Sequence, residues 1–537
     1  MRRLIIALVC MLVTSSHAQW PTNPEDQLWV GNGVYNSIVS DEDGGAYVAF
    51  TSFPASMQSR CYLQQLDADG YPQYPSPILL DVEHGTFIHD YNLRADGQGG
   101  CIVIVDELNT TEWTNRLGVF RYNQDGTSQY VNIAPVIPDI YVPETDFDTV
   151  TDHGGGIYIL RVSGNYACQR LGPDGERLWG DNGIILDVGT LVPSYQDLAI
   201  ASDGDYCYVV ARGDSIYAFK FTPDGNAVWG EDGIVIQDIG YDIDIIPDGL
   251  GGLIGACRDQ VDPMHHLFLF RLDSAGESVW ADEGLDLGDM HFNKSLVCHP
   301  PFFYVAWDSA YNSMTDFARL MKFDLDGTPI WDENVTVFSG TEGSTTVIMR
   351  DADETGLILT ASQPNPSDNT TLVAQKYDYD GNRLWAEDVV ITEDLLHQHD
   401  LYTNDRGGCL ISWHAIDPIY GQRICASMVN TFGEMGVVGI IPPQDEATLD
   451  FQMMTIFPNP FNAQTTISFD LPVASNVKLE VFHISGSRVG VGLAPTRWYN
   501  SGCHSIIFDG SNLPSGIYLY NLQIDNHRQT GKMLLLK

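Results

Sequence analysis

The chain has 537 residues, of which 44% are hydrophobic and only 18% are charged, and it contains 51 glycines. That length allows two or three ordinary domains, or one large β-structure with a smaller one. The formal net charge of −44 repels phosphate backbones, so nucleic acid is not an expected partner. Frequent glycines and aromatic residues favour strands joined by many tight turns.

Residues 1–18 read as a secretory signal peptide. The pair Arg2-Arg3 precedes an apolar run from Leu4 to Val13, and the small-x-small site Ser16-His17-Ala18 favours cleavage after Ala18. The apolar run is too short to span a bilayer, and no later run approaches the necessary length. We therefore expect an exported chain without a transmembrane segment.

The cysteines of the exported chain form no recognisable metal motif. Nine follow the signal segment, with scattered spacing and no CxxC: Cys61, Cys101, Cys168, Cys207, Cys257, Cys298, Cys409, Cys425 and Cys503. We expect mainly buried thiols, with one or two disulfides as the alternative for an exported protein. Lipidation at Cys10 is a further alternative, but Val9 precedes it where a lipobox requires a small residue.

Asp-Gly turns and their relatives recur about every fifty residues, which is the signature of a repeat architecture. Their glycines are Gly70, Gly126, Gly175, Gly225, Gly276, Gly327, Gly381 and Gly433. Each turn follows an alternating run that predicts a half-buried strand and a hairpin. Between the turns, apolar runs such as residues 99–105 and 407–413 indicate strands covered on both faces. Each unit therefore holds about four strands.

An aromatic residue stands four positions after seven of the eight turn glycines: Tyr74, Tyr130, Trp179, Trp229, Trp280, Trp331 and Trp385. The eighth turn has Val437 there instead. The N-terminal phrase LWVGNGV at residues 28–34 is similar to LWGDNGI at residues 178–184 and supplies Trp29. We predict that Trp29 completes the eighth unit and that its strand joins the last repeat, closing a ring without open edges.

Four-stranded units without helical periodicity predict an all-β fold, with an eight-bladed β-propeller over residues 19–441 and seven blades as the alternative. The turns at residues 174–179, 224–229 and 380–385 resemble the tryptophan-docking repeat of the pyrroloquinoline-quinone-like propeller superfamily. The resemblance implies that the repeated aromatic residues pack between blades. The quinone enzymes of that superfamily often carry adjacent cysteines over the cofactor. Because this chain has no Cys-Cys pair, and their calcium ligands and catalytic Asp cannot be placed, no cofactor is expected.

A linker over residues 442–454 leads to alternating strands that predict a small Ig-like β-sandwich at residues 455–537. This segment resembles the type A C-terminal sorting domain of the type IX secretion system. The motif residues include Pro458, Asn459, Pro460, Gly486, Gly516, Tyr518 and Lys532. His483 departs from the pattern, since the family often has Asp there. The resemblance implies recognition by the outer-membrane translocon and a secreted or surface location in a Gram-negative, Bacteroidetes-like bacterium.

Three turns resemble the start of a calcium loop: residues 67–70, 324–327 and 378–381. They lack the later oxygen ligands, so hairpin turns are favoured and calcium remains an alternative.

The histidine-rich stretch at residues 397–400 offers two imidazoles and a carboxylate but no third histidine at the required spacing. His265-His266 precedes an apolar strand, which favours a structural role. Residues 213–215 lack the second glycine of a nucleophile elbow. No metal site and no catalytic residue is assigned.

Two functions remain open. The first is a non-catalytic binding or interaction module with an unidentified extracellular ligand or protein, acting as a monomer. The second is an extracellular hydrolase or lyase for polysaccharide or peptide, with acid–base carboxylates at the propeller channel. A channel rich in Asp, Glu, His and Tyr with shifted pKa values would favour the enzyme, whereas a channel of small apolar residues would favour the scaffold.

Overall fold

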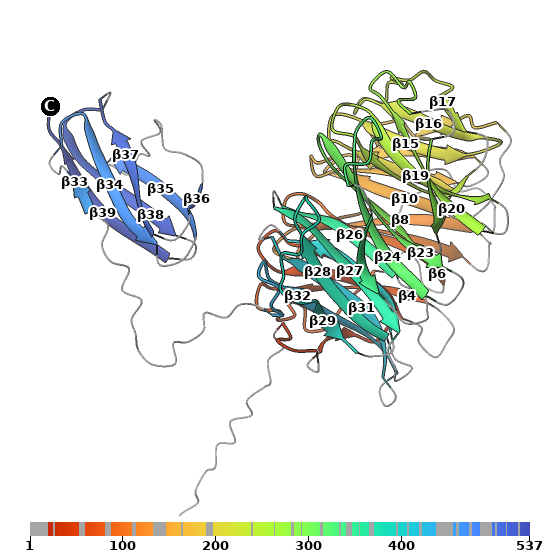
Figure 1. The fold of residues 1–537 in the computed structure, drawn as a ribbon, viewed down its shortest axis with the longest axis horizontal. Helices are drawn as coiled ribbons and strands as arrows, with labels where there is room; N and C mark the ends of the chain where they lie inside the picture. Colours follow the sequence, from red (N-terminus) through yellow and green to blue (C-terminus); the bar gives the residue numbers. More distant parts are fainter. Residues whose placement is uncertain are drawn as a thin grey trace, which may run out of the picture. The chain divides into compact units, whose positions relative to one another are not determined.

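The structure is a computed structural model that describes residues 20–436 and 455–537, with gaps. The gaps are 25–26, 53–58, 81–86, 110–113, 133–145, 163–164, 190–196, 238–239, 262–263, 281–283, 291–292, 312–314, 332–333, 340–345, 354, 365–369, 394–395, 405–406, 418–420, 458–460, 472–474, 484–496, 500–501, 512 and 525–526. The chain divides into two compact units, Met1–Gly439 and Ile440–Lys537. The described residues form strands and no helix (Figure 1), and none of them belongs to a membrane-crossing helix.

The first unit consists of eight antiparallel four-stranded sheets, which are the blades of a propeller. Blades 1 and 2 are β2 (Val34–Ser40), β3 (Ala46–Ser52), β4 (Arg60–Leu66), β5 (Ile78–Leu80), then β6 (Phe87–Ala95), β7 (Cys101–Asn109), β8 (Thr114–Tyr122), β9 (Ser128–Asn132). Blades 3 and 4 are β10 (Asp146–Thr151), β11 (Ile157–Val162), β12 (Tyr166–Leu171), β13 (Ile184–Leu186), then β14 (Leu198–Ser202), β15 (Cys207–Arg212), β16 (Ile216–Phe221), β17 (Ile234–Gln237).

The second half of the ring repeats this order. Blades 5 and 6 are β18 (Tyr241–Pro247), β19 (Leu253–Val261), β20 (Met264–Leu272), β21 (Leu285–Met290), then β22 (Lys294–His299), β23 (Phe302–Tyr311), β24 (Thr315–Asp324), β25 (Val335–Ser339). Blade 7 is β26 (Thr346–Asp353), β27 (Gly356–Pro364), β28 (Thr370–Tyr377), β29 (Val389–Thr392). Blade 8 is β30 (Leu396–Thr403), β31 (Cys409–Asp417), β32 (Gly421–Val429) and β1 (Leu28–Gly31). The expected all-β propeller is confirmed with eight blades rather than seven.

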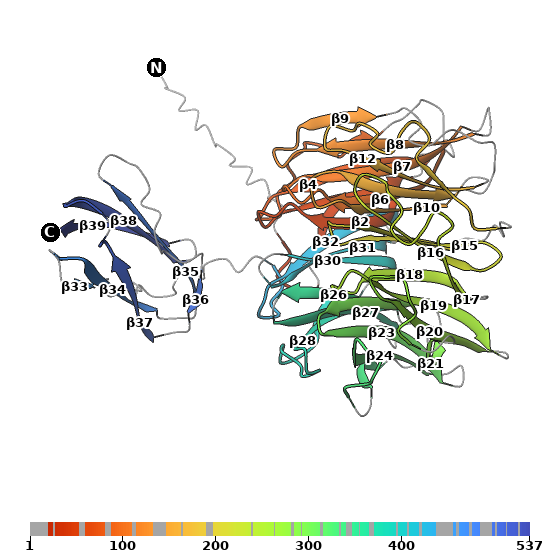
Figure 2. The same cartoon turned by 90° about the horizontal axis from the view of Figure 1, so that it is seen from above.

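The first strands of the blades surround the axis. In chain order, β2, β6, β10, β14, β18, β22, β26 and β30 each contact the next, and β30 contacts β2, so the contacts form a closed cycle. In Figure 2 the cyan strands β30–β32 lie between the red first blade and the green seventh blade. The beginning and the end of the repeat region therefore lie side by side.

The hydrophobic core is divided into layers between neighbouring blades. Each layer draws on the second and third strands of adjacent blades, and one of the layers joins blade 8 to blade 1. Because the second strand of a blade faces a layer on each side, its apolar run is continuous, and Cys101 to Val105 are all fully buried. The interpretation of these runs as doubly covered strands is confirmed.

The N-terminal strand closes the ring as the sequence predicts. β1 pairs antiparallel with β32, with Leu28 opposite Ala426 and Trp29 opposite Cys425. A strand from one end of the repeat region thus completes the sheet of the last blade. β1 thereby takes the outer position of blade 8, so both ends of the repeat region are held in one sheet.

The prediction that Trp29 is the docking aromatic residue at this seam is wrong. In most blades the turn aromatic donates a hydrogen bond to the next blade's turn: Trp179 Nε1 to Pro223 O (2.9 Å) and Trp385 Nε1 to Thr431 O (3.0 Å) are examples. At the seam Trp20 makes this bond, to Ala68 O at 3.0 Å, and is only 2% exposed. Trp29 is 52% exposed.

The turn of blade 8 explains why Trp20 and not Trp29 takes the docking position. Gly436 N donates to Met428 O (2.8 Å), as Leu178 N donates to Arg170 O in blade 3. The backbone oxygen of Trp20 lies 3.3 Å from the position that a Cβ on Gly436 would occupy. The segment at Trp20 therefore lies beside the end of the last turn at Gly436, and the similarity of residues 28–34 to residues 178–184 reflects a strand rather than a docking site.

A cation or amide five residues before seven of the eight turn glycines joins its blade to the next one, and we call this contact the inter-blade clasp. The seven residues are Gln65, Arg121, Arg170, Lys220, Arg271, Lys322 and Lys376, and each donates to a backbone oxygen of the next blade. Arg121, Arg170 and Arg271 also bind a buried Asp of their own blade at 2.6–2.8 Å. In blade 8, Met428 and Asn404 stand in the place of this ion pair.

The second unit contains two antiparallel sheets. One joins β33 (Thr455–Phe457), β34 (Gln464–Leu471) and β37 (Gly502–Asp509). The other joins β36 (Arg497–Tyr499), β35 (Ser475–His483), β38 (Gly516–Ile524) and β39 (His527–Leu535). Phe461, Ile467, Val481, Phe508, Tyr518, Met533 and Leu535 are buried in this unit.

Candidate functional site: the propeller channel

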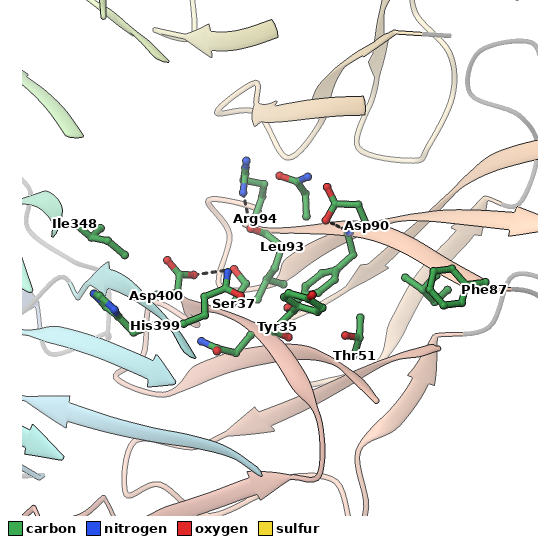
Figure 3. Close-up of a pocket in the computed structure, with 15 residues that line it drawn as sticks. Tyr35, Ser37, Thr51, Phe87, Asp90, Leu93, Arg94, Ile348, His399 and Asp400 are labelled. Carbon is green, nitrogen blue, oxygen red and sulfur yellow. Dashed lines mark hydrogen bonds between the residues drawn. The ribbon is translucent and has the colours of Figure 1, made fainter. Parts of the chain in front are cut away.

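Two cavities are lined by the inner strands of the blades. The first, of about 510 Å³, is lined by residues of β2, β6, β26 and β30, together with Thr51 of β3 (Figure 3). The second, of about 570 Å³, is lined by β18, β22, β26 and β30, together with Asn293. They share Ile348, Gln398 and His399, so they are neighbouring parts of one channel site.

Asp400 on β30 binds the edge of the first blade. Its Oδ2 accepts the backbone N–H of Ile38 at 3.0 Å and the hydroxyl of Ser37 at 2.8 Å, and the bond to Ser37 is drawn in Figure 3. The inner edge of β2 has no neighbouring strand to pair with there, because blades meet face to face. The carboxylate therefore satisfies a backbone donor that ladder pairing leaves free.

Blades 2, 3 and 4 are joined in the same way. Arg94 on β6 donates to Thr149 O (2.9 Å) and pairs with the carboxylate of Asp148 at 3.3 Å. Asp148 in turn accepts Ile200 N of β14 at 3.1 Å. Burial raises the pKa of Asp148, while the Arg94 guanidinium and the backbone donors oppose that rise.

Further round the ring, Lys294 and Ser295 of β22 join blades 5, 6 and 7. Lys294 Nζ lies 3.0 Å from Asp242 and 3.1 Å from Asp244 on β18. Burial opposes the charge of Lys294, but the Asp244 and Asp242 carboxylates raise its pKa. Ser295 exchanges hydrogen bonds with the backbone of Met349 on β26 at 3.0 and 3.1 Å.

His399 is a buried, neutral member of the channel lining. It is 3% exposed, and its Nε2 lies 3.1 Å from the Thr360 hydroxyl. Burial, with help from the charge of Arg350, lowers its pKa to about 4. Its Nδ1 and the Oδ1 of Asn36, which lines the first cavity, are buried without a hydrogen-bond partner among the described residues. An imidazole with so low a pKa is neutral near pH 7.

The lining has the Asp, His and Tyr side chains and the shifted His399 pKa that the sequence analysis associates with an enzyme channel. Asp400, Asp148, Arg94 and Lys294 are engaged in bonds between blades, and the channel is polar rather than the small apolar lining that the scaffold hypothesis anticipated. Among the described residues, no group of three His, Cys, Asp or Glu is placed to hold a metal ion. What the lining offers is a set of fixed donors and acceptors, with Tyr35 58% exposed at its edge.

Sequence reasoning found only one part of this site. Of the histidine-rich stretch at residues 397–400, His399 and Asp400 line the channel, and the side chain of His397 lies outside the described residues. The other lining residues come mainly from the inner strands of different blades, from Tyr35 to Arg350 along the chain, and no local pattern brings them together.

The remaining candidate stretches serve local structure. Asp67, Asp324 and Asp378 accept backbone N–H groups within their own hairpin turns. His266 lies 2.9 Å from Asp286 and 3.3 Å from Asp289. Asp214, in the turn between β15 and β16, accepts the hydroxyl of Tyr217 at 2.7 Å.

The other repeat aromatics lie at blade junctions where they are described. Trp229 and Trp280 donate to the next turn, and Tyr74 donates its hydroxyl to Gly126 O. Trp331 contacts the position of a Cβ on Gly381. The side chain of Tyr130 lies outside the description.

The cysteines follow the expectation of buried thiols. Cys61, Cys101, Cys168, Cys207, Cys257, Cys409 and Cys425 are buried thiols outside any disulfide among the described residues, and Cys298 is a partly buried one. The side chain of Cys503 lies outside the description.

The predicted sorting motif is only partly described. Pro458, Asn459, Pro460 and Gly486 lie outside the described residues. Gly516 begins β38, and the buried Tyr518 donates its hydroxyl to Pro514 O at 2.8 Å. Lys532 is exposed on β39.

The fold defines the first unit as an eight-bladed β-propeller. Residues 455–536 match the secretion system C-terminal sorting domain family, which confirms the sorting domain. The chain is exported through the type IX secretion system to the cell surface or the medium, and its C-terminal domain interacts with that secretion machinery. A search of curated proteins finds no match.

Solved propeller structures resemble the chain at very low sequence identity. The BP39L lectin of Burkholderia pseudomallei is 10% identical, with 66% of this chain and 98% of the lectin covered and a TM-score of 0.43. The phage phi92 endosialidase is 8% identical, with 82% and 72% covered and a TM-score of 0.36. A family 43 arabinoxylan arabinofuranohydrolase of Bacillus subtilis is 10% identical, with 97% and 99% covered and a TM-score of 0.29. Similarities of this size carry no conclusion about activity.

Proposed function

We propose that the protein is an exported, non-catalytic binding module whose propeller channel holds a polar extracellular ligand. The observation that carries the proposal is the engagement of the channel charges. Asp400, Arg94, Asp148 and Lys294 join neighbouring inner strands at 2.8–3.3 Å. A carboxylate fixed between backbone donors is a poor proton shuttle, because proton transfer would break the bonds that join the blades.

The proposal includes the organisation of the chain. Residues 1–18 are a signal peptide, residues 19–441 form the propeller, residues 442–454 are a linker and residues 455–537 form an Ig-like sandwich. The Gly-x-x-x-Trp turns support a repeat of the pyrroloquinoline-quinone-like type. The sorting domain supports a Bacteroidetes-like Gram-negative source, and the closed ring supports a monomer.

One experiment separates the two functions. The secreted full chain would be incubated with neutral polysaccharides, acidic polysaccharides and mixed peptides. Retention would be measured on immobilised protein, and new chain ends would be measured by mass spectrometry. The proposal expects retention without products, and retention reduced by Tyr35→Ala. Products that disappear in Asp90→Ala, whose carboxylate lines the first cavity, would establish the hydrolase or lyase instead.

A further inference from the structure

A third cavity, of about 630 Å³, lies at the seam where β1 of blade 8 meets blade 1. We call it the seam groove. Its lining includes Trp29 and Asn32 from the N-terminal strand and its following loop, Ser52 from β3 and Tyr62 from β4, with Tyr74 and Ser76 from the turn segment of blade 1. It shares no residue with either channel cavity.

Trp29 presents its indole side chain to this groove. Closure of the ring does not require that side chain. The backbone of β1 forms the ladder with β32, and Trp20 provides the buried docking contact. The indole of Trp29 is 52% exposed, and the guanidinium of Arg423 lies 5.9 Å from its ring centre. A large aromatic side chain kept half-exposed beside a cavity is typical of a ligand-binding surface.

Two further aromatic rings of the groove are held in fixed positions. Tyr62 stacks on Phe50 with ring centres 5.6 Å apart and an angle of 19° between planes. The Tyr74 hydroxyl donates to Gly126 O at 3.2 Å, which fixes that ring. The groove therefore offers a rigid aromatic surface, and binding to it costs little side-chain entropy.

None of the described residues that line the groove is charged, although the chain carries 71 acidic residues and the guanidinium of Arg423 lies 5.9 Å from the Trp29 ring centre. The channel cavities differ in this respect, since Asp90, Arg94 and Asp400 line the first and Lys294 lines the second. The polar groups of the seam groove are amides and hydroxyls, of which Asn32 and Ser76 are exposed. This lining matches a neutral ligand with an apolar face and many hydroxyl groups.

We propose that the seam groove binds a neutral oligosaccharide, with the C–H face of a pyranose ring against the indole of Trp29. The sugar hydroxyls would bond the amide of Asn32 and the hydroxyls of Ser52 and Ser76. The inference rests on the proposed binding function of the propeller but places a second ligand site outside the channel. Aromatic contact gives the affinity, and the neutral polar groups select the orientation of the sugar.

The test is calorimetric titration of the secreted full chain with cellotetraose, xylotetraose and mannotetraose. Tetragalacturonate and a ten-residue proline peptide serve as acidic and peptide probes. Binding of at least one neutral tetrasaccharide is expected. Trp29→Ala should weaken it by about tenfold or more, whereas Trp29→Phe should keep it within about threefold.

The matched control is Ile185→Ala. Ile185 is 54% exposed in the middle of β13, the outer strand of blade 3, and pairs there as Trp29 pairs in blade 8. The Ile185→Ala variant should leave the affinity for the neutral tetrasaccharide unchanged. Trp29→Ala, Trp29→Phe and Ile185→Ala should all keep the melting temperature of the parent within about 2 °C.

Three outcomes would overturn the inference. They are no binding of any neutral tetrasaccharide, binding of only tetragalacturonate or the proline peptide, and neutral-sugar binding that survives Trp29→Ala. If sugar binding depends on Tyr35 of the channel and not on Trp29, the seam groove is refuted while the proposed channel function stands.

Discussion

Trp20 and Trp29 occupy one short segment but have different surroundings, so they make the clearest residue-scale comparison. Trp20→Ala should lower the free energy of unfolding by about 3–5 kcal/mol, because it removes a buried indole and its bond to Ala68 O. Trp29→Ala should cost much less, since half of that side chain is already exposed. Urea denaturation of the two full-length variants measures both effects. Equal losses, or a larger loss for Trp29→Ala, would contradict the assignment of the seam.

His399 makes stability depend on pH. Its folded-state pKa of about 4 lies below the ordinary value of 6.5, so the unfolded chain binds more protons between these values. The stability that the neutral imidazole contributes is fully present above about pH 6.5 and is lost as the pH falls toward 4. The loss in the free energy of unfolding reaches about 3 kcal/mol.

The variant His399→Gln isolates this contribution from that of the many carboxylates. Its unfolding free energy should fall less steeply between pH 6.5 and pH 4 than that of the parent chain. Denaturation curves across that pH range provide the comparison. Parallel pH profiles for the two proteins would show that His399 does not titrate on unfolding.

At the scale of elements, the inter-blade clasp makes a prediction within the repeat. Arg271→Met leaves the buried carboxylate of Asp248 without its 2.6 Å partner and removes the bond to Leu325 O. We expect a loss of about 3–5 kcal/mol, because an uncompensated buried charge remains.

The last blade supplies the matched control, since it carries Met428 and Asn404 in the corresponding places. The double variant Arg271→Met with Asp248→Asn reproduces that pair and should recover most of the loss. Chemical denaturation of both variants gives the coupling energy. A double variant as unstable as Arg271→Met alone would show that the ion pair is not the source of the loss.

Most of the strands and their grouping into blades could be predicted from the sequence. The turn glycines and alternating runs were sufficient for eight four-stranded units, because strand periodicity and turn chemistry are local. The N-terminal strand was predicted because blade 8 lacked an outer strand. The cations five residues before the turn glycines were present in the same runs and would have revealed the clasp. Trp20 could not be predicted from the repeat, because no turn glycine stands four residues before it as one does before Trp179 and Trp385.

At the scale of the whole molecule, the site could not be predicted. Asp400 meets Ile38 across 362 positions of sequence, and only closure of the ring brings them together. Whether a channel carboxylate is free for chemistry depends on such partners, which no local pattern reports. The sorting domain, in contrast, is encoded by one contiguous segment, so it could be predicted directly from the sequence.

Export gives a prediction for the whole chain. Deleting residues 455–537 should leave the propeller folded but retained in the periplasm, because the matched sorting domain is removed. Cell fractionation with a thermal unfolding curve of the retained protein measures both properties. Normal secretion of the truncated chain would contradict the role of the domain.

The most direct test of the account is the thermal unfolding of the full-length Asp400→Ala variant. The account holds that the channel carboxylate joins blade 8 to blade 1, so its removal leaves the buried Ile38 N–H unpaired. We predict a melting temperature about 1–4 °C below that of the parent, from a loss of about 1–3 kcal/mol. An unchanged or higher melting temperature would contradict this account, because that is the behaviour expected when a catalytic carboxylate is removed.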